Sequence, residues 1–367
     1  MLPEPEAEAL AASGALLQRI REELAAGGNW IGFARYMELA LHEPVLGYYA
    51  GGAAKLGAPG DFATAPELGA LFARTLARQV AELLLPGEAI LEFGAGSGAL
   101  AEALIAELSP EQYLILETSA ELRARQEARL GARARWVERL PERFRGVMLA
   151  NEVADAMPVH AVTWRPHGVQ ERGVAEIEGR LAWAERPASG ELLAAARALA
   201  VPVPYESEIG LVARAWTKLL AARLARGALL VADYGFPRHE YYHPQRSMGT
   251  LMCHYRHRAH GDPFFHPGLQ DITAHVDFSA MAQAARAGGL EVLGFASQAQ
   301  FLVNCGITGV LEREDTANAA RYAPRAAEAQ RLLSPAEMGE IFKVLAVGRG
   351  VSRPLLGFAQ GDRSHAL

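Results

Sequence analysis

The stretch GEAILEFGAGSG, Gly87–Gly98, decides the fold that the sequence predicts. An apolar run ends at Phe93, a turn dense in glycine follows, and a helical pattern begins at Ala99. Glycine adopts backbone conformations that other residues resist, and the start of a helix presents free N–H groups. The stretch therefore predicts a buried strand, a tight turn, and a helix whose first turn lies against a bound ligand.

The spacing of the glycines is typical of one class of cofactor loop. The pattern E-x-G-x-G-x-G resembles the S-adenosylmethionine (SAM) loop that follows the first strand of class I methyltransferases. It does not match the dinucleotide fingerprint G-x-G-x-x-G, because the third glycine comes one position too early. The resemblance implies that Glu92, Gly94, Gly96 and Gly98 form part of a SAM site.

A second acid is a candidate ligand for the same cofactor. Residues 113–117, YLILE, read as a short buried strand that ends in Glu117. This acid lies roughly 20 residues beyond the glycine loop, the spacing at which an acid reaches a ribose diol in doubly wound folds. We expect Glu117 to bind the ribose. The alternative is that Glu117 only helps to cap the next helix, for which Ser119 is also a candidate N-cap.

Composition and charge narrow the class of protein. The chain has 367 residues, of which 50% are hydrophobic and 21% charged, as in ordinary globular proteins. Its net charge of −6 provides no overall positive field, so a nucleic-acid partner is not expected. The only cysteines, Cys253 and Cys305, do not support a disulfide framework or a zinc cluster, and we expect no metal.

The sequence also bears on location. No apolar stretch is long enough to cross a bilayer without interruption by charge. The acidic N-terminus has neither the basic start and apolar core of a signal peptide nor the Arg-rich character of a transit peptide. We expect a cytoplasmic protein that does not insert into membranes.

Strands and helices alternate through the central part of the chain. Alternation of this kind predicts a parallel sheet covered by helices on both faces. The strands are expected at 89–93, 113–117, 146–150, 227–233, 290–296 and 341–347, and the helices at 98–108, 119–130 and 207–226. An antiparallel final strand would complete the seven-stranded, Rossmann-like sheet of the class I SAM-dependent methyltransferase fold, an α/β fold.

The remaining segments predict additions to this core. Residues 1–85 are expected to form a helical N-terminal extension and a cofactor lid, and residues 86–350 the methyltransferase core. The mixture of apolar, polar and turn residues over 159–185 predicts inserted antiparallel strands, within an insert of about 159–206. A long loop is expected over about 236–278, where prolines recur.

Several further segments together resemble a single family, the MidA-like SAM-dependent methyltransferases. Each segment is short, but they occur in the order found in that family, and the resemblance runs from about Tyr36 to Val347. The segments are GYY at 47–49, GDFATAPE at 60–67, ANEVADAMPVH at 150–160, DYG at 233–235 and DITAHVDF at 271–278.

The resemblance implies a function. The family includes a mitochondrial assembly factor of respiratory complex I that methylates a protein arginine. We therefore expect SAM as the methyl donor, a protein as the partner, and protein arginine N-methylation as the reaction. A subunit of a respiratory complex is one candidate target. Two alternatives remain open: methylation of a small molecule or nucleic acid, and a non-catalytic assembly factor that only binds SAM. The inserted strands could serve a homodimer interface or substrate docking.

Candidates for binding the methyl acceptor follow the fourth strand of the core. Glu152 stands at the carboxyl edge of the sheet, where open α/β sheets place their sites. A carboxylate pair can hold a guanidinium by two hydrogen bonds, and Asp155 is the candidate second acid. The alternative is that both acids favour a helix start. Asn151 is a candidate for bonding the SAM amino group or an acceptor amide. His275, with Asp277, is a further candidate that accepts a proton or orients a carboxylate; a structural histidine is the alternative.

The segment at 60–67, before the long amphipathic helix expected over 68–85, is the candidate lid over SAM. Gly60 permits unusual dihedral angles, Asp61 can accept from a cofactor amine, and Thr64 offers a hydroxyl group. The family resemblance favours contact between Phe62 and the cofactor. The alternative is a plain capped entry to a helix, since Pro66 suits a first helical position.

Overall fold

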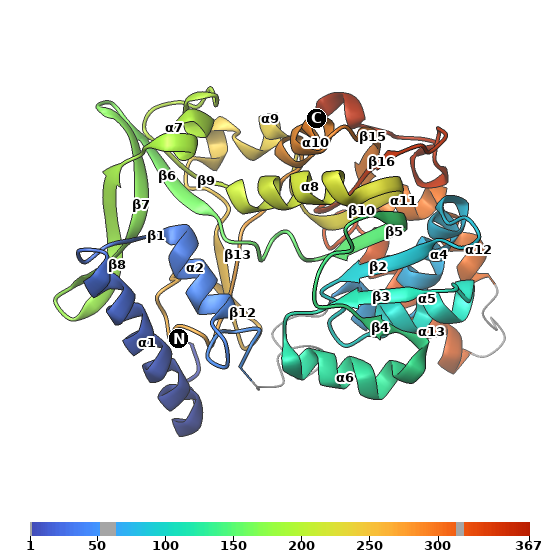
Figure 1. Cartoon of the computed structure of the whole chain (residues 1–367), viewed down its shortest axis with the longest axis horizontal. Helices are drawn as coiled ribbons and strands as arrows, with labels where there is room; N and C mark the ends of the chain where they lie inside the picture. Colours follow the sequence, from blue (N-terminus) through green and yellow to red (C-terminus); the bar gives the residue numbers. More distant parts are fainter. Residues whose placement is uncertain (1, 52–63, 313–318) are drawn as a thin grey trace.

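The computed structural model describes residues 2–51, 64–312 and 319–367. Its main sheet has the strand order β15-β16-β10-β5-β2-β3-β4, and a short strand, β14, also pairs with β10. Strand β16 runs antiparallel to both neighbours, while β4, β3, β2, β5 and β10 are parallel. The strands are β2 (Ala89–Phe93), β3 (Tyr113–Leu116), β4 (Arg135–Trp136), β5 (Phe144–Asn151), β10 (Leu224–Phe236), β14 (Val276–Asp277), β15 (Glu291–Ser297) and β16 (Phe342–Arg349). The predicted sheet with an antiparallel last strand is confirmed (Figure 1).

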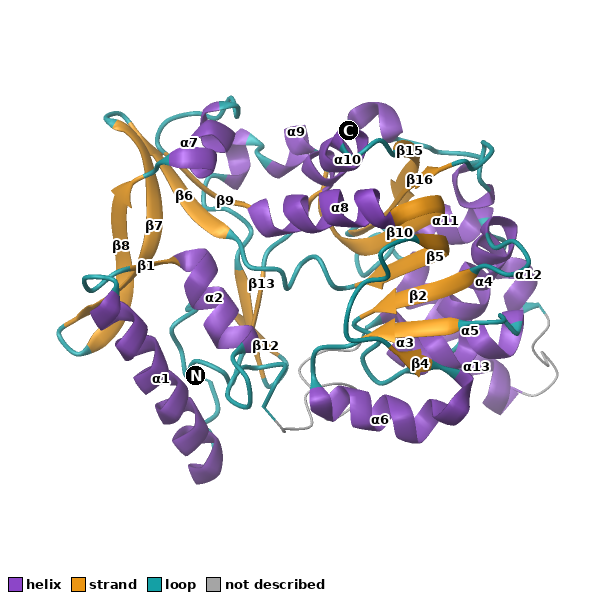
Figure 2. Cartoon of the chain, in the orientation of Figure 1, coloured by secondary structure: helices purple, strands orange, loops and turns teal. Residues whose placement is uncertain are grey.

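Helices cover both faces of this sheet, as its buried strands require. Residues 147–150 of β5 are all buried, because parallel strands are apolar on both sides. One apolar core lies between the sheet and α4 (Leu71–Leu83), α5 (Ala99–Leu108), α11 (Gln298–Asn304), α12 (Ile307–Leu311) and α13 (Ala319–Leu333). The other lies under α8 (Leu211–Arg223) and α10 (Phe278–Ala287). Figure 2 shows these two helical layers flanking the strands.

A second unit stands beside the carboxyl edge of the sheet. Its antiparallel sheet has the order β1-β7-β6-β9, and β8 pairs with β7 along residues 170–177. Its elements are α1 (Ala7–Ala26), β1 (Ile31–Gly32), α2 (Phe33–His42), β6 (His160–Arg165), β7 (Gly168–Ile177), β8 (Arg180–Pro187), α7 (Gly190–Arg197) and β9 (Tyr205–Ile209). The N-terminal extension is therefore not purely helical, since β1 pairs with β7 of the insert.

Two expected elements differ from the structure. The helix expected over 207–226 is α8 alone: residues 207–209 belong to β9, which pairs with β6, and β10 begins at Leu224. The apolar residues at the ends of this stretch are buried in sheets, which a helical spacing does not reveal.

The prediction of a long loop over 236–278 is also wrong. This segment holds a short helix and a three-stranded sheet of order β12-β11-β13. These strands have only three or four residues, too few to show an alternating pattern. The elements are α9 (Arg238–Tyr241), β11 (Met252–Tyr255), β12 (Arg258–His260) and β13 (Asp271–Thr273).

The remaining helices are short or lie at the rim of the main sheet. They are α3 (Ala65–Leu68), α6 (Ala120–Leu130), and the 3-10 turns Gly131–Arg133, Pro244–Arg246, Leu356–Phe358 and Ser364–Ala366. Across the described ranges, no helix has both the length and the apolar character needed to cross a membrane.

Candidate active site

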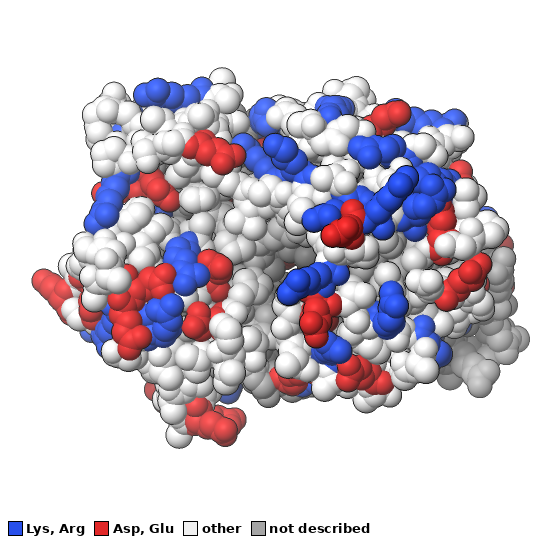
Figure 3. Space-filling model, in the orientation of Figure 1, with Lys and Arg blue, Asp and Glu red and all other residues white. Residues whose placement is uncertain are grey.

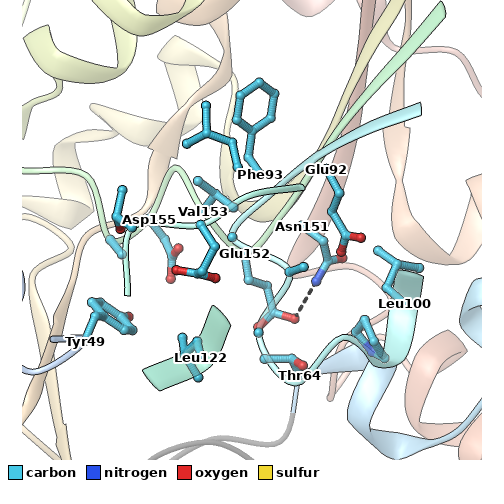
Figure 4. A pocket seen from close by; sticks show the side chains of 18 of the residues that line it. Tyr49, Thr64, Glu92, Phe93, Leu100, Leu122, Asn151, Glu152, Val153 and Asp155 are labelled. Atoms are coloured by element: carbon cyan, nitrogen blue, oxygen red, sulfur yellow. Dashed lines mark hydrogen bonds between the residues drawn. The ribbon is translucent and has the colours of Figure 1, made fainter. Parts of the chain in front are cut away.

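A cavity of about 400 Å³ opens where β2, β3, β5 and β10 end, and it reaches the second unit (Figure 4). One end, here called the glycine-loop end, is lined by Glu92–Gly96, Ala99, Leu100, Leu116–Thr118 and Leu122. The opposite end, called the acidic end, is lined by His42, Tyr48, Tyr49, Glu152, Asp155, Tyr234 and Asp271. Figure 4 shows Glu92 and Leu100 on one side, Tyr49 and Asp155 on the other, and Glu152 between them.

The glycine loop has the backbone that its sequence predicts. Gly94, Gly96 and Gly98 all have positive φ, at 57°, 55° and 81°, a region that favours glycine. A Cβ added at Gly94 would meet only Val153, at 3.4 Å, so this position borders open space of the cavity. Helix α5 begins at Ala99, directly after the loop. The loop thus leaves room for a ligand against its backbone and points a helix N-terminus towards it.

Glu117 directly follows β3, and both of its carboxylate oxygens accept hydrogen bonds. Its Oε1 accepts a hydrogen bond from the Ser119 N–H at 2.9 Å, and its Oε2 accepts one from Gln126 Nε2 at 2.9 Å. Because each carboxylate oxygen has two lone pairs, both can still accept from a diol. Ser119 is the residue that caps α6, since its hydroxyl accepts from Leu122 N.

Gln126 is a site residue that sequence reasoning missed. This fully buried side chain donates to the carbonyl of Gly96 and to Glu117, both at 2.9 Å, and accepts from the Trp136 indole. It thereby ties the glycine loop to the second acid. The sequence gives no signal for it, because Gln126 lies in a strongly charged helix whose inward face is not apparent.

Glu92 ends the first core strand as a buried acid. Its Oε2 accepts from the Tyr113 hydroxyl at 2.5 Å. Burial raises the pKa of Glu92 to about 7, although the tyrosine hydrogen bond opposes this shift. Glu92 lines the cavity. Because its pKa is about 7, its carboxyl group can be neutral or ionised near neutral pH.

The entry to α3 lies over the glycine-loop end. Thr64, Pro66 and Glu67 line the cavity, and Glu67 accepts a hydrogen bond from the Ser97 hydroxyl of the glycine loop. Thr64 does not cap α3 with its side chain. The other expected lid residues, Gly60, Asp61 and Phe62, lie outside the described residues.

Glu152 occupies the middle of the cavity in an unusual conformation. Its φ of 54° is rare for a residue other than glycine. Its Oε1 accepts from the Ala65 N–H and from Asn151 Nδ2, both at 3.2 Å. Burial, and then the negative charge of Asp155, raise the pKa of Glu152 to about 8. Asn151 thus lines the cavity and orients Glu152 from the preceding position.

Two further acids at the acidic end are each held by a tyrosine. The Tyr234 hydroxyl donates to Asp155 Oδ2, and the Tyr49 hydroxyl donates to Asp271 Oδ1 at 2.8 Å. Asp155 Oδ1 is buried with no hydrogen-bond partner, and burial raises the pKa of this carboxyl. Tyr49, Tyr234 and Asp271 were not among the expected site residues. Their presence in the GYY, DYG and DITAHVDF segments was the signal that could have identified them.

His275 lies outside the cavity. Its ring stacks on Phe236, with centroids 5.2 Å apart at 8°, and meets the Tyr234 ring edge-on at 5.2 Å. Burial lowers its pKa to about 4, so the ring is neutral. Asp277 caps α10 by accepting from Ala280 N at 2.9 Å. The structure therefore gives both residues packing or capping contacts and does not place either among the residues that line the cavity.

The electrostatic character of the acidic end is one-sided. Among the described residues that line the cavity, none is Lys or Arg, while Glu152, Asp155 and Asp271 are carboxylic acids. The described part of the chain holds no group of three or more His, Cys, Asp or Glu side chains suited to a metal ion. A cationic ligand would balance these acids.

Comparison with known proteins assigns the chain to a family. A family profile described as "Putative S-adenosyl-L-methionine-dependent methyltransferase" matches residues 71–296. The chain belongs to this family. A crystal structure from Burkholderia thailandensis bound to S-adenosyl-homocysteine is similar over 100% of both chains, with 49% identity and a TM-score of 0.96.

More distant relatives carry a more specific name. The Drosophila melanogaster "Protein arginine methyltransferase NDUFAF7 homolog, mitochondrial" is 28% identical, over 97% of this chain and 91% of the relative. The Homo sapiens protein arginine methyltransferase NDUFAF7 is 26% identical, over 86% of this chain and 79% of the relative.

The family and the fold together identify the cofactor as SAM. The glycine-loop end fits this group, because Gly94 leaves a cradle that a side chain would fill and Glu117 keeps free lone pairs beside it. The chain is thus a SAM-dependent methyltransferase of the class I fold, and the acidic end lies where its cavity continues beyond the glycine loop.

Proposed function

We propose that this methyltransferase modifies arginine side chains of a protein, and that the acidic end holds the guanidinium group. The observation that carries the proposal is the set of three acids, Glu152, Asp155 and Asp271, in a cavity whose described lining contains no Lys or Arg. Burying several carboxylates without a counter-charge is costly, and a cationic ligand removes that cost.

The shape of the guanidinium group suits the neighbouring side chains. Arginine stays protonated, with a pKa above about 12, and its planar fork binds carboxylates through two parallel hydrogen bonds. A planar cation also stacks on aromatic rings. The rings of His42 and Tyr49 are stacked on each other at this end, with centroids 5.6 Å apart.

We assign the cofactor to the glycine-loop end, with Glu117 on the ribose hydroxyls and Glu92, Gly94, Gly96 and Gly98 around the remainder. Bound SAM supplies an electrophilic methyl group. Because Glu152 lies between Glu92 and Asp155, on the side of the acidic end that faces the glycine loop, it is the acid best placed to hold the acceptor nitrogen at the cofactor. Holding the reactive groups in line is the main contribution of the protein to such a transfer.

The acceptor nitrogen must also lose a proton when it gains a methyl group. Glu152 has a pKa of about 8 in the free protein, so its carboxylate form is a stronger base than an ordinary glutamate. We assign it the role of holding the guanidinium and accepting this proton, with Asp155 as the second carboxylate. The relatives named as protein arginine methyltransferases support the same class of acceptor.

The test is a labelling experiment on the proteins of a strain that lacks this gene. The purified enzyme is incubated with methyl-labelled SAM and that extract, and the labelled proteins are hydrolysed to amino acids. We expect the label in methylated arginine. Label in another amino acid, in small molecules or in nucleic acid would overturn the arginine assignment.

Two variants separate the parts of the proposal. Glu152→Gln should abolish labelling and retain SAM binding, whereas Gly96→Arg should abolish both, because a large side chain at a φ of 55° fills the loop. If Glu152→Gln labelled arginine as fast as the wild type, the role of Glu152 would be wrong.

A further inference from the structure

We infer that Asp233 and Tyr234, at the carboxyl end of β10, are positioning residues that hold Glu152 and Asp155 in the geometry that receives the acceptor. This inference rests on the proposed function of the acidic end. It concerns a pair of adjacent residues, of which Tyr234 lines the cavity and Asp233 is fully buried beside it.

Asp233 gathers the backbone of the loop that follows Glu152. Its Oδ2 accepts hydrogen bonds from three consecutive N–H groups, those of Val153, Ala154 and Asp155, at 3.2, 2.9 and 3.3 Å. Its Oδ1 accepts from Tyr234 N at 3.0 Å. Successive N–H groups that converge on one anion form a concave nest, which only a particular run of backbone dihedral angles allows. The buried Asp233 side chain therefore selects one conformation of this loop.

That conformation is the one in which Glu152 has a positive φ. A glutamate at a φ of 54° is strained and persists only where the surroundings impose it. Strand β10 supplies the constraint on both sides, because the Ala232 carbonyl accepts from Glu152 N at 2.9 Å and Asp233 binds the next three N–H groups. The direction of the Glu152 side chain follows from these contacts.

Tyr234 fixes the second acid. Its hydroxyl donates to Asp155 Oδ2, which leaves Oδ1 buried and without a hydrogen-bond partner. The Tyr234 ring is itself held edge-on by His275, at 5.2 Å, and by Phe342, at 5.5 Å. This explains the buried His275, which packs behind the tyrosine and outside the cavity. One carboxylate oxygen of Asp155 is thus tethered and the other is available to an acceptor.

The test compares Asp233→Asn and Tyr234→Phe with the wild type in the labelling assay described above. In Asp233→Asn, an NH₂ group replaces one acceptor oxygen and faces backbone N–H donors. We expect kcat to fall at least tenfold in both variants, while the Kd for S-adenosylhomocysteine changes less than twofold. A crystal structure of Asp233→Asn should show residue 152 outside the left-handed region and the glycine loop unchanged.

A matched pair of buried residues that do not line the cavity serves as the control. Tyr241 donates to Glu208, which also accepts from Thr250 N, and neither Tyr241 nor Glu208 lines the cavity. Glu208→Gln and Tyr241→Phe should lower the melting temperature and leave kcat unchanged in the folded protein. A general effect of losing a buried acid or hydroxyl would instead lower kcat in all four variants.

Several outcomes overturn the inference, and they differ from failure of the proposed function. Wild-type kcat in Tyr234→Phe or in folded Asp233→Asn would overturn it, as would a loss of kcat in Asp233→Asn with the 152–155 backbone unchanged. If Asp233→Asn does not fold, Tyr234→Phe alone decides. The proposed function fails instead when Glu152→Gln keeps full activity or when the wild type labels an acceptor other than arginine.

Discussion

At the scale of single residues, burial acts on the acids of the cavity in one direction. It raises the pKa of Glu92 to about 7 and of Glu152 to about 8, and it also raises the pKa of Glu117. Groups with such shifts cluster at functional sites because binding and proton transfer need them there. Two measurements follow: the stability of the protein against pH for Glu92, and the affinity for SAM for Glu117.

The stability of the ligand-free protein should depend on pH through Glu92. Its pKa is about 7 when folded and 4.5 in its unperturbed state, so the folded protein binds this proton more tightly. The stabilisation is full below pH 4.5 and is lost as pH rises through about 7. In Glu92→Gln this loss should disappear, which raises stability relative to wild type at pH 8 by about 3 kcal/mol.

Urea unfolding of ligand-free wild type and Glu92→Gln at pH 5, 6.5 and 8 checks this expectation. The Tyr113 hydroxyl can still donate to the glutamine carbonyl, so the variant keeps its hydrogen bond. A difference between the two proteins that does not change with pH would contradict the raised pKa of Glu92.

Replacing Glu117 should weaken cofactor binding. If its carboxylate binds the ribose hydroxyls, Glu117→Ala removes hydrogen bonds to a charged group, each about 1.5–3 kcal/mol. We expect the Kd for SAM, measured by calorimetry, to rise about 10–100-fold. Glu127→Ala is the control. Glu127 lies in α6, the helix that follows Glu117, but its carboxylate pairs with Arg123 at the surface. Unchanged affinity in Glu117→Ala would favour the capping interpretation.

At the scale of elements, the parallel strands of the core approach closely where glycines replace side chains. Gly146 of β5 has a φ of 129°, and an added Cβ would lie 2.0 Å from the Ala89 carbonyl oxygen of β2. Gly168, at the start of β7, has nearly the same φ, 130°, but a Cβ there meets nothing within 4 Å. The two positions therefore separate backbone strain from steric exclusion.

Gly146→Ala should destabilise the protein much more than Gly168→Ala. Strain at an unfavourable φ costs about 1–3 kcal/mol in both variants. Overpacking adds about 1–3 kcal/mol or more at Gly146 alone, because the neighbouring atoms are backbone and cannot move aside. Urea unfolding measures the loss of stability in each variant. If Gly146→Ala accumulates in inclusion bodies and Gly168→Ala does not, that result also supports the larger loss at Gly146. Equal stability losses would contradict the close approach of β2 and β5.

The elements that the sequence predicted are those with a local signal. The strand, glycine turn and helix at 89–108 were predictable because the apolar run and the glycines are contiguous. The boundary between α8 and β10 was not, because both are apolar and follow each other without a break at Leu224. The pairing of β1 with β7 joins Ile31 to Val174, and no local pattern encodes a contact so distant in sequence.

The candidate site was predictable to a similar extent. Glu117 and Glu152 were identifiable because each directly follows a recognisable strand. Asp271 and Tyr49 were not identified, because they reach the cavity only after β13 and the segment beyond α2 fold back against the sheet. Gln126 was not identified, because it bonds Glu117 and the glycine loop only once α6 has packed behind them.

At the scale of the whole molecule, the cavity lies between two separately packed parts. The core of the second unit buries α1 and α2 with Cys253 and Ile272, and it is distinct from the two cores of the main sheet. The acidic end takes Tyr49 from the segment after α2, Asp271 from β13, which packs against the second unit, and Glu152 from the main sheet. Figure 3 shows that the surface is hollowed between these two parts.

A bound cofactor should therefore slow the hydrogen exchange of backbone amides in one part of the molecule more than in the other. Ligand binding slows hydrogen exchange of amides whose local opening it suppresses. With S-adenosylhomocysteine, we expect slower exchange over residues 92–100 and 116–122, which surround the glycine-loop end, and unchanged exchange in β6, β7 and β8. Mass spectrometry of exchanged peptides checks this. Protection confined to β6–β8 would place the cofactor elsewhere.

The acceptor, by contrast, bridges both parts, and its binding should depend on pH. In the free protein, Glu152 has a pKa of about 8, so at pH 7 it is mostly protonated. A bound guanidinium favours the carboxylate form, so binding below pH 8 releases this proton and becomes stronger as pH rises. The kcat/KM for arginine methylation should therefore increase from pH 6 to about 8, by up to tenfold per pH unit, and then level off.

The pH profile of kcat/KM at saturating SAM measures this dependence, and Asp277→Asn provides its control. Asp277 is also a buried carboxylic acid, but it caps α10 outside the cavity lining, so its replacement should leave the profile unchanged. A rate that falls between pH 6 and 8 would mean that the protonated form of Glu152 receives the acceptor. An uncharged acceptor would then fit this end of the cavity better than arginine does, because only the protonated acid can donate a hydrogen bond to it.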